Sequence, residues 1–296
     1  MSNCYPIKLS PHVVTPIWGS EHWLLSTREN AASVVQNGPF AGLGLGELFA
    51  QQPEWFGTNC AGKDFPLLIK FIDANDDLSI QVHPSDNDTD VLLAGEAGKT
   101  ECWYILSATP SAKLVLGFRE TITKEQFAKA IAENTIMDHV QSYNVKPGDF
   151  FYIPAGTLHA IGKGVRLAEV QQNSDTTYRV YDYNRMQNGA PRPLHIAQAM
   201  AVTELAPFEP APQPSDALVQ NELFTLKSCS GPTGFCGHVG TDNFHSLVFI
   251  EADDNCMLTC PNCPPLPVGK DDSVFLPAGL GDYRVEGNCK ALLTTV

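Results

Sequence analysis

The sequence predicts a mainly β protein that contains two related β domains and a small helical insertion in the first of them. Only 18% of the 296 residues are charged, and the chain contains 22 prolines and 23 glycines, a composition typical of short strands joined by many turns. Two segments centred on Pro154 and Pro277 each contain an aspartate, an apolar strand and the tripeptide Pro-Ala-Gly, which indicates two copies of one domain. The expected division is a first domain over residues 1–206, a linker over 207–216 and a second domain over 217–296.

The bulk charge and the cysteines narrow the class of protein. A formal net charge of −14 argues against nonspecific binding to nucleic acid or to an anionic membrane, because both need clustered Lys and Arg. The N-terminus lacks the pattern of a signal peptide, and no apolar run approaches the length of a transmembrane helix. Nine cysteines, mostly isolated in the sequence, are typical of reduced thiols. We therefore expect a cytoplasmic protein with no nucleic-acid or membrane partner and leave the oligomeric state open.

The individual elements follow from the apolar pattern along the chain. Residues 1–60 contain short apolar runs between Gly and Pro, which predicts short strands and loops. The apolar run 65–72 predicts a buried strand, and the polar turn after it indicates a hairpin with the stretch 78–84. Residues 121–140 begin with a threonine that can cap a helix and form the predicted helical insertion. A further helix is expected over 194–205.

The stretch 78–84 carries polar residues at every second position. In a β-strand, Ser79, Gln81 and His83 lie on one face, and three apolar residues lie on the other. A hydroxyl, an amide and an imidazole in a row are poor material for a core. They can instead hold a metal ion or a polar ligand.

Two further segments can complete a metal site. The next predicted strand carries Glu101 between Lys99 and Trp103 on one face, and a Pro-Ala-Gly turn precedes His159. Two imidazoles, one carboxylate and one amide oxygen suit zinc or another borderline divalent ion, with room for water or substrate. The candidate ligands are Gln81, His83, Glu101 and His159. Because Asp282 aligns with His159 in the second copy, we expect one zinc ion per chain and a second domain without metal ligands.

A cysteine cluster offers an alternative zinc site. Cys256, Cys260 and Cys263 are close in sequence, with Cys289 as a distant fourth ligand. The segment from Cys260 to Cys263 is typical of a turn, and a second matching pair is missing. Reduced thiols in a loop are therefore the favoured interpretation.

The sequence around His159 resembles the second conserved motif of the cupins, which are small double-stranded β-helix (jelly-roll) barrels that hold a metal. Gly148, Pro154, Gly156 and His159 match that motif, whereas Lys163 stands where it usually has Asn. Four stretches sharpen the resemblance to the type I mannose-6-phosphate isomerases in their short bacterial form. These stretches are 79–84, 98–104, 154–162 and 169–182. The loop near the N-terminus departs from that family because it is shorter.

This resemblance implies a fold, a reaction and a set of site residues. The fold is two cupin-type double-stranded β-helix domains, and the reaction is the interconversion of mannose 6-phosphate and fructose 6-phosphate through a cis-enediol. The implied zinc ligands are the four candidates already named. The implied active-site residues are Ser79, Lys99, Glu169, Asp175 and Arg179. The expected partner is therefore a phosphorylated hexose substrate.

The residue types suit an aldose–ketose isomerisation, which moves a proton between C1 and C2 of an open-chain sugar. Glu169 is the first candidate for the proton-transfer group and Lys99 is its rival. Arg179 can hold developing oxyanion charge, and Asp175 can orient it. The candidates for binding the phosphate are Lys99, Arg179, Lys163, Arg166 and Arg192. The alternatives are a non-catalytic cupin that senses a sugar or sugar phosphate, and an iron dioxygenase, which Gln81 as a ligand disfavours.

Overall fold

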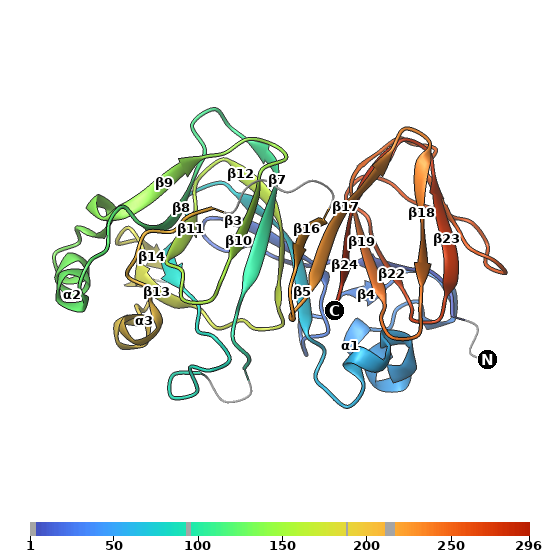
Figure 1. Ribbon diagram of the computed structural model, residues 1–296, viewed down its shortest axis with the longest axis horizontal. Coiled ribbons are helices and arrows are strands. Elements are labelled where there is room, and N and C mark those ends of the chain that lie inside the picture. The colour runs from blue at the N-terminus through green and yellow to red at the C-terminus, as the bar shows by residue number, and fades with distance from the viewer. Residues whose placement is uncertain (1–3, 93–95, 188, 211–216) are drawn as a thin grey trace. The chain divides into compact units, whose positions relative to one another are not determined.

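The computed structural model describes residues 4–92, 96–187, 189–210 and 217–296. These residues form a mainly β structure, as predicted (Figure 1). Its helices are α1 Leu45–Gln51, α2 Lys124–Ala132 and α3 Ile196–Val202, with 3₁₀ turns at Gly38–Phe40, Pro53–Phe56, Thr58–Cys60 and Ile136–Asp138. None of the described helices is long and apolar enough to cross a membrane.

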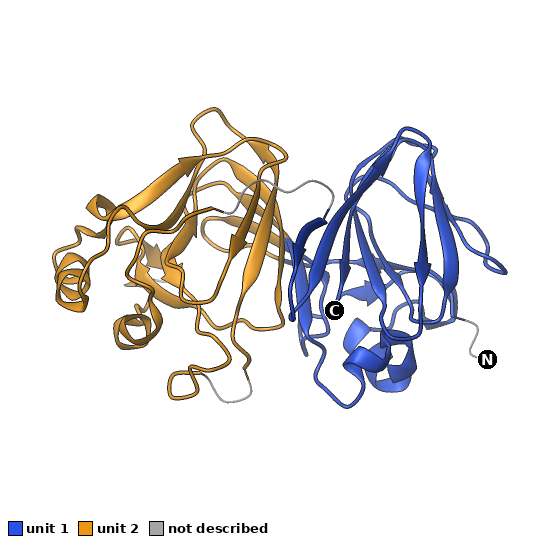
Figure 2. Cartoon of the chain, viewed as in Figure 1, with its two compact units in different colours: residues 1–13, 22–70, 213–296 blue, residues 14–21, 71–212 orange. Residues whose placement is uncertain are grey.

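Two compact units divide the chain (Figure 2). One comprises residues 1–13, 22–70 and 213–296, and the other comprises residues 14–21 and 71–212. This division differs from the expected first domain over 1–206, because the N-terminal residues group with the C-terminal ones. The physical reason is strand pairing: Ile7 in the first strand pairs with Phe275. Most of the expected linker, residues 211–216, lies outside the described residues.

Most strands of residues 71–212 belong to two sheets. The six-stranded sheet has the order β10-β7-β12-β5-β3-β2, with β2 His12–Val14, β3 Gly19–Leu25, β5 Leu67–Ala74, β7 Glu101–Ala108, β10 Phe150–Ile153 and β12 Val165–Gln172. The five-stranded sheet has the order β13-β6-β11-β8-β9, with β6 Ile80–Val82, β8 Lys113–Phe118, β9 Val140–Asn144, β11 His159–Ile161 and β13 Tyr178–Tyr181. A small ribbon pairs β14 Met186–Gln187 with β15 Ala190–Pro191.

The other unit also has two sheets. The seven-stranded sheet has the order β16-β17-β24-β19-β22-β1-β4, with β1 Ile7–Ser10, β4 Val34–Val35, β16 Ala217–Gln220, β17 Thr225–Gly231, β19 His245–Ala252, β22 Ser273–Leu276 and β24 Cys289–Thr295. The four-stranded sheet has the order β18-β23-β20-β21, with β18 Gly234–Val239, β20 Met257–Thr259, β21 Leu266–Pro267 and β23 Gly281–Glu286.

The internal repeat inferred from the Pro-Ala-Gly segments is confirmed by the strand order. The run β10-β7-β12-β5 corresponds to β22-β19-β24-β17, and β6-β11-β8-β9 corresponds to β18-β23-β20-β21. Gly156 and Gly279, the last residues of the two Pro-Ala-Gly turns, have φ values of 87° and 78°, a left-handed conformation that favours glycine. The two copies therefore share both topology and turn geometry.

The five-stranded sheet packs on both of its faces. One face shares a core with the six-stranded sheet, in which Leu114 and Ile161 meet Trp103 and Leu167. The opposite face forms a second core with α2 and α3. On β6, β11 and β13 the second core takes every other residue, for example Ile80, Ala160 and Tyr178. The residues between them therefore face the six-stranded sheet.

Three local predictions were wrong or too long. The stretches 65–72 and 78–84 do not pair as a hairpin, because β5 belongs to the six-stranded sheet and β6 to the five-stranded one. The predicted helix over 121–140 is capped by Thr123 as expected but ends at Ala132. Asn134 then adopts a φ of 57°, a left-handed conformation that stops a helix. The helix expected over 194–205 is shorter, as α3 shows.

Candidate metal centre and active site

Three candidate side chains form one row across the five-stranded sheet. Gln81 on β6 pairs with His159 on β11 and with Arg179 on β13. Directly paired residues of antiparallel strands share a face, so these side chains lie on the same side of the sheet. That side faces the six-stranded sheet, because their sequence neighbours belong to the core that the helices cover. The polar row predicted from residues 79–83 is thus directed into the barrel.

The six-stranded sheet supplies carboxylates to the same interior. Glu101 begins β7, and Trp103 two residues later is fully buried in the core that the two sheets share. Glu169 on β12 pairs with Trp103 in the register. Both carboxylates are buried, with exposed fractions of 1% and 3%. Ionisable groups this deep in a barrel need charged or metal partners.

His83, Glu101 and His159 form a group whose ligand atoms all lie within 4.8 Å of one another. The His83 Nε2 atom is 3.6 Å from Glu101 Oε2, and His159 Nε2 is 3.5 Å from Glu101 Oε1. Ligands bound about 2.1 Å from a tetrahedral zinc ion lie about 3.4 Å apart, so these separations fit shared coordination. No other such group occurs among the residues that the structure describes. The alternative zinc site at Cys256, Cys260, Cys263 and Cys289 is therefore not supported by the positions of these cysteines.

Both imidazoles are held in the tautomer that a metal requires. The Nδ1 atom of His83 lies 2.8 Å from the carbonyl oxygen of Thr176, and Nδ1 of His159 lies 2.9 Å from that of Thr157. A carbonyl accepts only from an N–H, so each Nδ1 carries the proton and each Nε2 presents a lone pair to the site. Burial lowers the pKa of His159 to about 4, which keeps this ring neutral at physiological pH.

Gln81 completes the set of candidate ligands. Its amide nitrogen lies 3.4 Å from His159 Nε2, and Ser79 Oγ donates to its Oε1 at 3.3 Å. A rotation of this amide by about 180° would direct its oxygen to His159 instead. A metal ligand must be that oxygen. Ser79 would then accept from the amide nitrogen, so the same hydroxyl supports either orientation.

Lys99 lies between the two buried carboxylates. Its Nζ atom is 3.0 Å from Glu101 Oε2 and 3.8 Å from Glu169 Oε1. Burial acts to lower the pKa of Lys99, but the charges of Glu101 and Glu169 outweigh it and raise the pKa. A metal ion bound next to Lys99 would lower its pKa and so act against these carboxylates. Gly98 lets the backbone before Lys99 pack closely against the backbone of Asp86, because a Cβ at that position would lie 2.4 Å from the Asp86 nitrogen.

Trp103 is a site residue that the sequence did not single out. Its indole Nε1 donates to Glu169 Oε2 at 3.0 Å, and its ring meets His159 edge-on with centroids 5.4 Å apart. The indole therefore contacts both a metal-ligand candidate and the candidate proton-transfer group. The alternation of Lys99, Glu101 and Trp103 predicted that Trp103 lies on the same strand face as Glu101. Only the register with β12 reveals the contact with Glu169.

Arg179 and Asp175 lie at the edge of the same site. Among the described residues, the Nε atom of Arg179 has no hydrogen-bond partner. Burial and the neighbouring Arg192 lower the pKa of Arg179, and Asp182 and Asp175 oppose that shift. Asp175 is exposed and lies within electrostatic range of both Arg179 and Lys99. The backbone N–H of Arg179 donates to His195 Nδ1, and the Arg179 carbonyl accepts from the His195 backbone N–H. The sequence did not point to His195.

The other basic candidates have different surroundings. Arg166 pairs with Asp73 at 3.2 Å and stacks on an aromatic ring. Arg192 forms two bonds of 2.6 Å to the buried Asp182 carboxylate. Both guanidinium groups are thus already paired with carboxylates of this chain.

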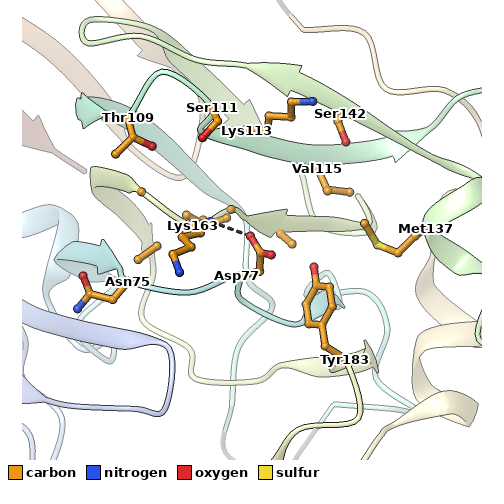
Figure 3. Close-up of a pocket in the computed structure, with 15 residues that line it drawn as sticks. Asn75, Asp77, Thr109, Ser111, Lys113, Val115, Met137, Ser142, Lys163 and Tyr183 are labelled. Carbon is orange, nitrogen blue, oxygen red and sulfur yellow. Dashed lines mark hydrogen bonds between the residues drawn. The ribbon is translucent and has the colours of Figure 1, made fainter.

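Lys163 lines a hollow of about 470 Å³ on the helix-covered side of the five-stranded sheet. Val115 and Ala160, which line it too, belong to the core of that side. Figure 3 shows Lys163 and Asp77 in this hollow with the Tyr183 ring beside them. The metal-ligand candidates face the opposite side of the sheet. The structure therefore separates Lys163 from them.

The chain is similar to several known proteins. The family model of the type I phosphomannose isomerase catalytic domain matches residues 11–104. The probable mannose-6-phosphate isomerase GmuF of Bacillus subtilis (strain 168) is 34% identical, and the alignment covers 98% of this chain and 99% of that protein. The crystal structure of the mannose 6-phosphate isomerase from Bacillus subtilis superposes with a TM-score of 0.89 at 32% identity, covering 98% of this chain and 99% of that one.

A zinc-bound mannose 6-phosphate isomerase shares the fold, with a TM-score of 0.76 at 15% identity and 98% of each chain covered. The similarity to the Bacillus proteins extends over nearly the whole chain, so it spans both copies of the repeat. The resemblance inferred from four short motifs is thereby confirmed. The chain belongs to the type I phosphomannose isomerases.

Proposed function

We propose that the chain interconverts mannose 6-phosphate and fructose 6-phosphate as a zinc-dependent aldose–ketose isomerase with one zinc ion per chain. The observation that carries this proposal is the pair Lys99 and Glu169, buried directly beside the group formed by His83, Glu101 and His159. A protein that only sensed a sugar phosphate would need the metal and a basic residue. It would not need two buried groups that can move protons.

The donor set supports zinc as the bound ion. Two neutral imidazoles and a carboxylate, with an amide oxygen from Gln81, are ligands that zinc accepts. The ligand charges sum to −1, so a divalent ion bound by these residues would leave a net positive site in an acidic protein. When bound, zinc would attract the substrate oxygens at C1 and C2 and stabilise negative charge on them.

Glu169 is the proposed proton-transfer group. Its carboxylate is buried and is held by the Trp103 indole, so one oxygen is fixed and the other faces Lys99 at 3.8 Å. A carboxylate held in this way can remove a proton from C2 of the open-chain aldose and return it to C1. Lys99 can hydrogen-bond a substrate oxygen and is the rival base. The intermediate of this transfer is a cis-enediol.

Arg179 is the proposed partner of the substrate's anionic oxygens. Its side chain shares a face with Gln81 and His159, and its Nε atom has no hydrogen-bond partner among the described residues. A guanidinium stays protonated and presents several donors, so it can bind an enediolate oxygen or a phosphate. Ser79, next to Gln81, and Asp175, near Arg179, are proposed to bind substrate. We expect the reaction to occur in the cytoplasm, where thiols stay reduced.

An isomerase assay with and without metal tests this function. Purified protein loaded with zinc should convert mannose 6-phosphate to fructose 6-phosphate, and a chelator should abolish turnover, which added zinc should restore. A clean, zinc-loaded preparation without turnover would contradict the proposal. Hydrogen exchange at C2 of bound sugar phosphate separates the enzyme from a sensor, because a sensor binds the sugar without exchanging that hydrogen.

A further inference from the structure

Three cysteines gather in the unit formed by residues 1–13, 22–70 and 213–296. The sulfur of Cys263 lies 3.8 Å from the carbonyl oxygen of Cys4, and the Cys260 and Cys263 thiols share a hydrogen bond. All three thiols are partly exposed, whereas Cys256 and Cys289 are buried in the barrel core. The cluster considered from sequence is therefore split, and only Cys260 and Cys263 remain together with access to solvent.

The backbone between Cys260 and Cys263 forms a tight turn. The Cys263 nitrogen donates to the Cys260 carbonyl at 3.4 Å. Pro261 at the second position and Asn262 with a φ of 63° at the third are the residues that a type II turn prefers. The ends of such a turn have Cα atoms less than about 7 Å apart, which overlaps the range of about 4.4–6.8 Å that a disulfide requires. The turn thus brings the backbone of the two cysteines into the range of separations that a disulfide requires before any reaction.

We propose that Cys260 and Cys263 form a thiol–disulfide exchange site that reacts with small disulfides and closes into a disulfide within the turn. The turn is already folded in the reduced protein, so closure orders few additional backbone torsions. The site belongs to a different unit from the metal ligands and is independent of the proposed isomerase reaction.

The exchange balances with a disulfide as the oxidant. The Cys263 thiolate attacks one sulfur of the oxidant, whose S–S bond breaks, and the released thiolate takes up a proton. Cys260 then loses its proton and attacks the Cys263 sulfur, which releases the second thiol. Two hydrogens and two electrons pass from the turn to the oxidant. Burial and the hydrogen bond to Cys263 raise the pKa of Cys260 to about 12, which suits the thiol that reacts second.

The test uses the full chain with Cys236→Ser, because Cys236 is an exposed single thiol that would take up oxidant on its own. The reduced protein is incubated with glutathione disulfide, and intact mass and titratable thiols are measured. The expected result is the loss of two thiols without a gain of glutathione. With Cys260→Ser added, the expected result is a stable adduct of one glutathione, because the second thiol is missing.

Two outcomes would overturn the proposal. One is that the Cys236→Ser protein keeps all its thiols, or carries bound glutathione, under conditions that oxidise a free dithiol. The other is that Cys4→Ser in the same background prevents the loss of two thiols, which would place the bond at Cys4. A Cys260→Ser protein that gains no glutathione would likewise contradict attack by Cys263. Cooperative thermal unfolding of each reduced variant verifies its fold, and the isomerase assay separately reports the proposed function.

Discussion

Replacing Trp103 by Phe tests whether the indole positions the Glu169 carboxylate. The substitution removes the Nε1 donor that lies 3.0 Å from Glu169 Oε2 and keeps an aromatic ring in the core. Trp103 is fully buried and Glu169 is 3% exposed, so water cannot easily replace the lost donor. The carboxylate should then occupy more than one orientation. We expect kcat to fall while zinc content stays unchanged.

The size of the effect follows from the hydrogen bond. A bond to a charged acceptor contributes about 1.5–3 kcal/mol, and each 1.36 kcal/mol corresponds to about a tenfold change in rate. If the transition state uses the whole of that bond, kcat falls by about ten- to hundredfold. The smaller ring also leaves a gap, which should lower the free energy of unfolding by about 1–3 kcal/mol. KM should change by less than about threefold, because the indole does not lie among the proposed substrate-binding groups.

Steady-state kinetics of zinc-loaded Trp103→Phe measure this split between kcat and KM. Phe151→Leu is a matched control, because Phe151 pairs with Trp103 in the register and occupies the same core but has no hydrogen-bonding group. It should lose stability and keep kcat. In a Glu169→Gln background, Trp103→Phe should lower kcat by less than about twofold more, since both changes act on one group. Fully additive losses in the double variant would refute a positioning role.

Three further predictions concern the metal, the base and the second barrel. His159→Ala should lower both zinc content, read by metal analysis, and turnover; full zinc occupancy would remove His159 from the ligand set. Glu169→Gln should keep zinc and lower kcat by about 10²–10⁴-fold; an unchanged kcat would transfer the role to Lys99, which Lys99→Met then tests. Burial, Lys227 and His238 lower the pKa of His245 in the folded protein to about 4, from its usual value of 6.5. Below pH 6.5 the unfolded chain therefore binds a proton at His245 that the folded protein does not bind. Stability should therefore fall by about 1–2 kcal/mol from pH 7 to pH 5, and His245→Gln should remove that part of the pH dependence in chemical denaturation, whereas an unchanged slope would contradict it.

The strand faces of the site could be predicted because a strand alternates. Gln81 lies between two residues of the helix-covered core, so its direction into the barrel follows from period two alone. The turn before His159 has its own signature in Pro154 and Gly156, and the same signature at Pro277 and Gly279 revealed the repeat. Local chemistry therefore specified which side chains enter the interior.

Pairing between distant strands could not be predicted in the same way. The run 65–72 precedes β6 with only a short turn between them, yet its strand β5 lies beside β12 and β3. A double-stranded β-helix alternates consecutive strands between two sheets, so nearness in sequence misled the hairpin prediction. For the same reason the contact between Trp103 and Glu169, which depends on the register of β7 with β12, was not visible in the sequence.

Among the described residues, the second copy of the repeat lacks a metal site for reasons beyond the replacement of His159 by Asp282. Asp282 aligns with His159, but Gly281, with a φ of 82°, precedes it, and Asp282 faces outward with its side chain 84% exposed. Tyr283 enters the core instead. His245 begins β19 as Glu101 begins β7, and its Nδ1 lies 3.2 Å from the Tyr283 hydroxyl.

Burial lowers the pKa of His245 and raises the pKa of Tyr283, so both groups are neutral near pH 7. In the first copy the corresponding interior holds a carboxylate between two imidazoles that present lone pairs. A divalent cation needs such an anionic ligand to offset the cost of leaving water, and a neutral imidazole–phenol pair does not provide one. His245 and Tyr283 in the second barrel therefore partner each other without an ion, which is the physical basis for expecting one metal per chain.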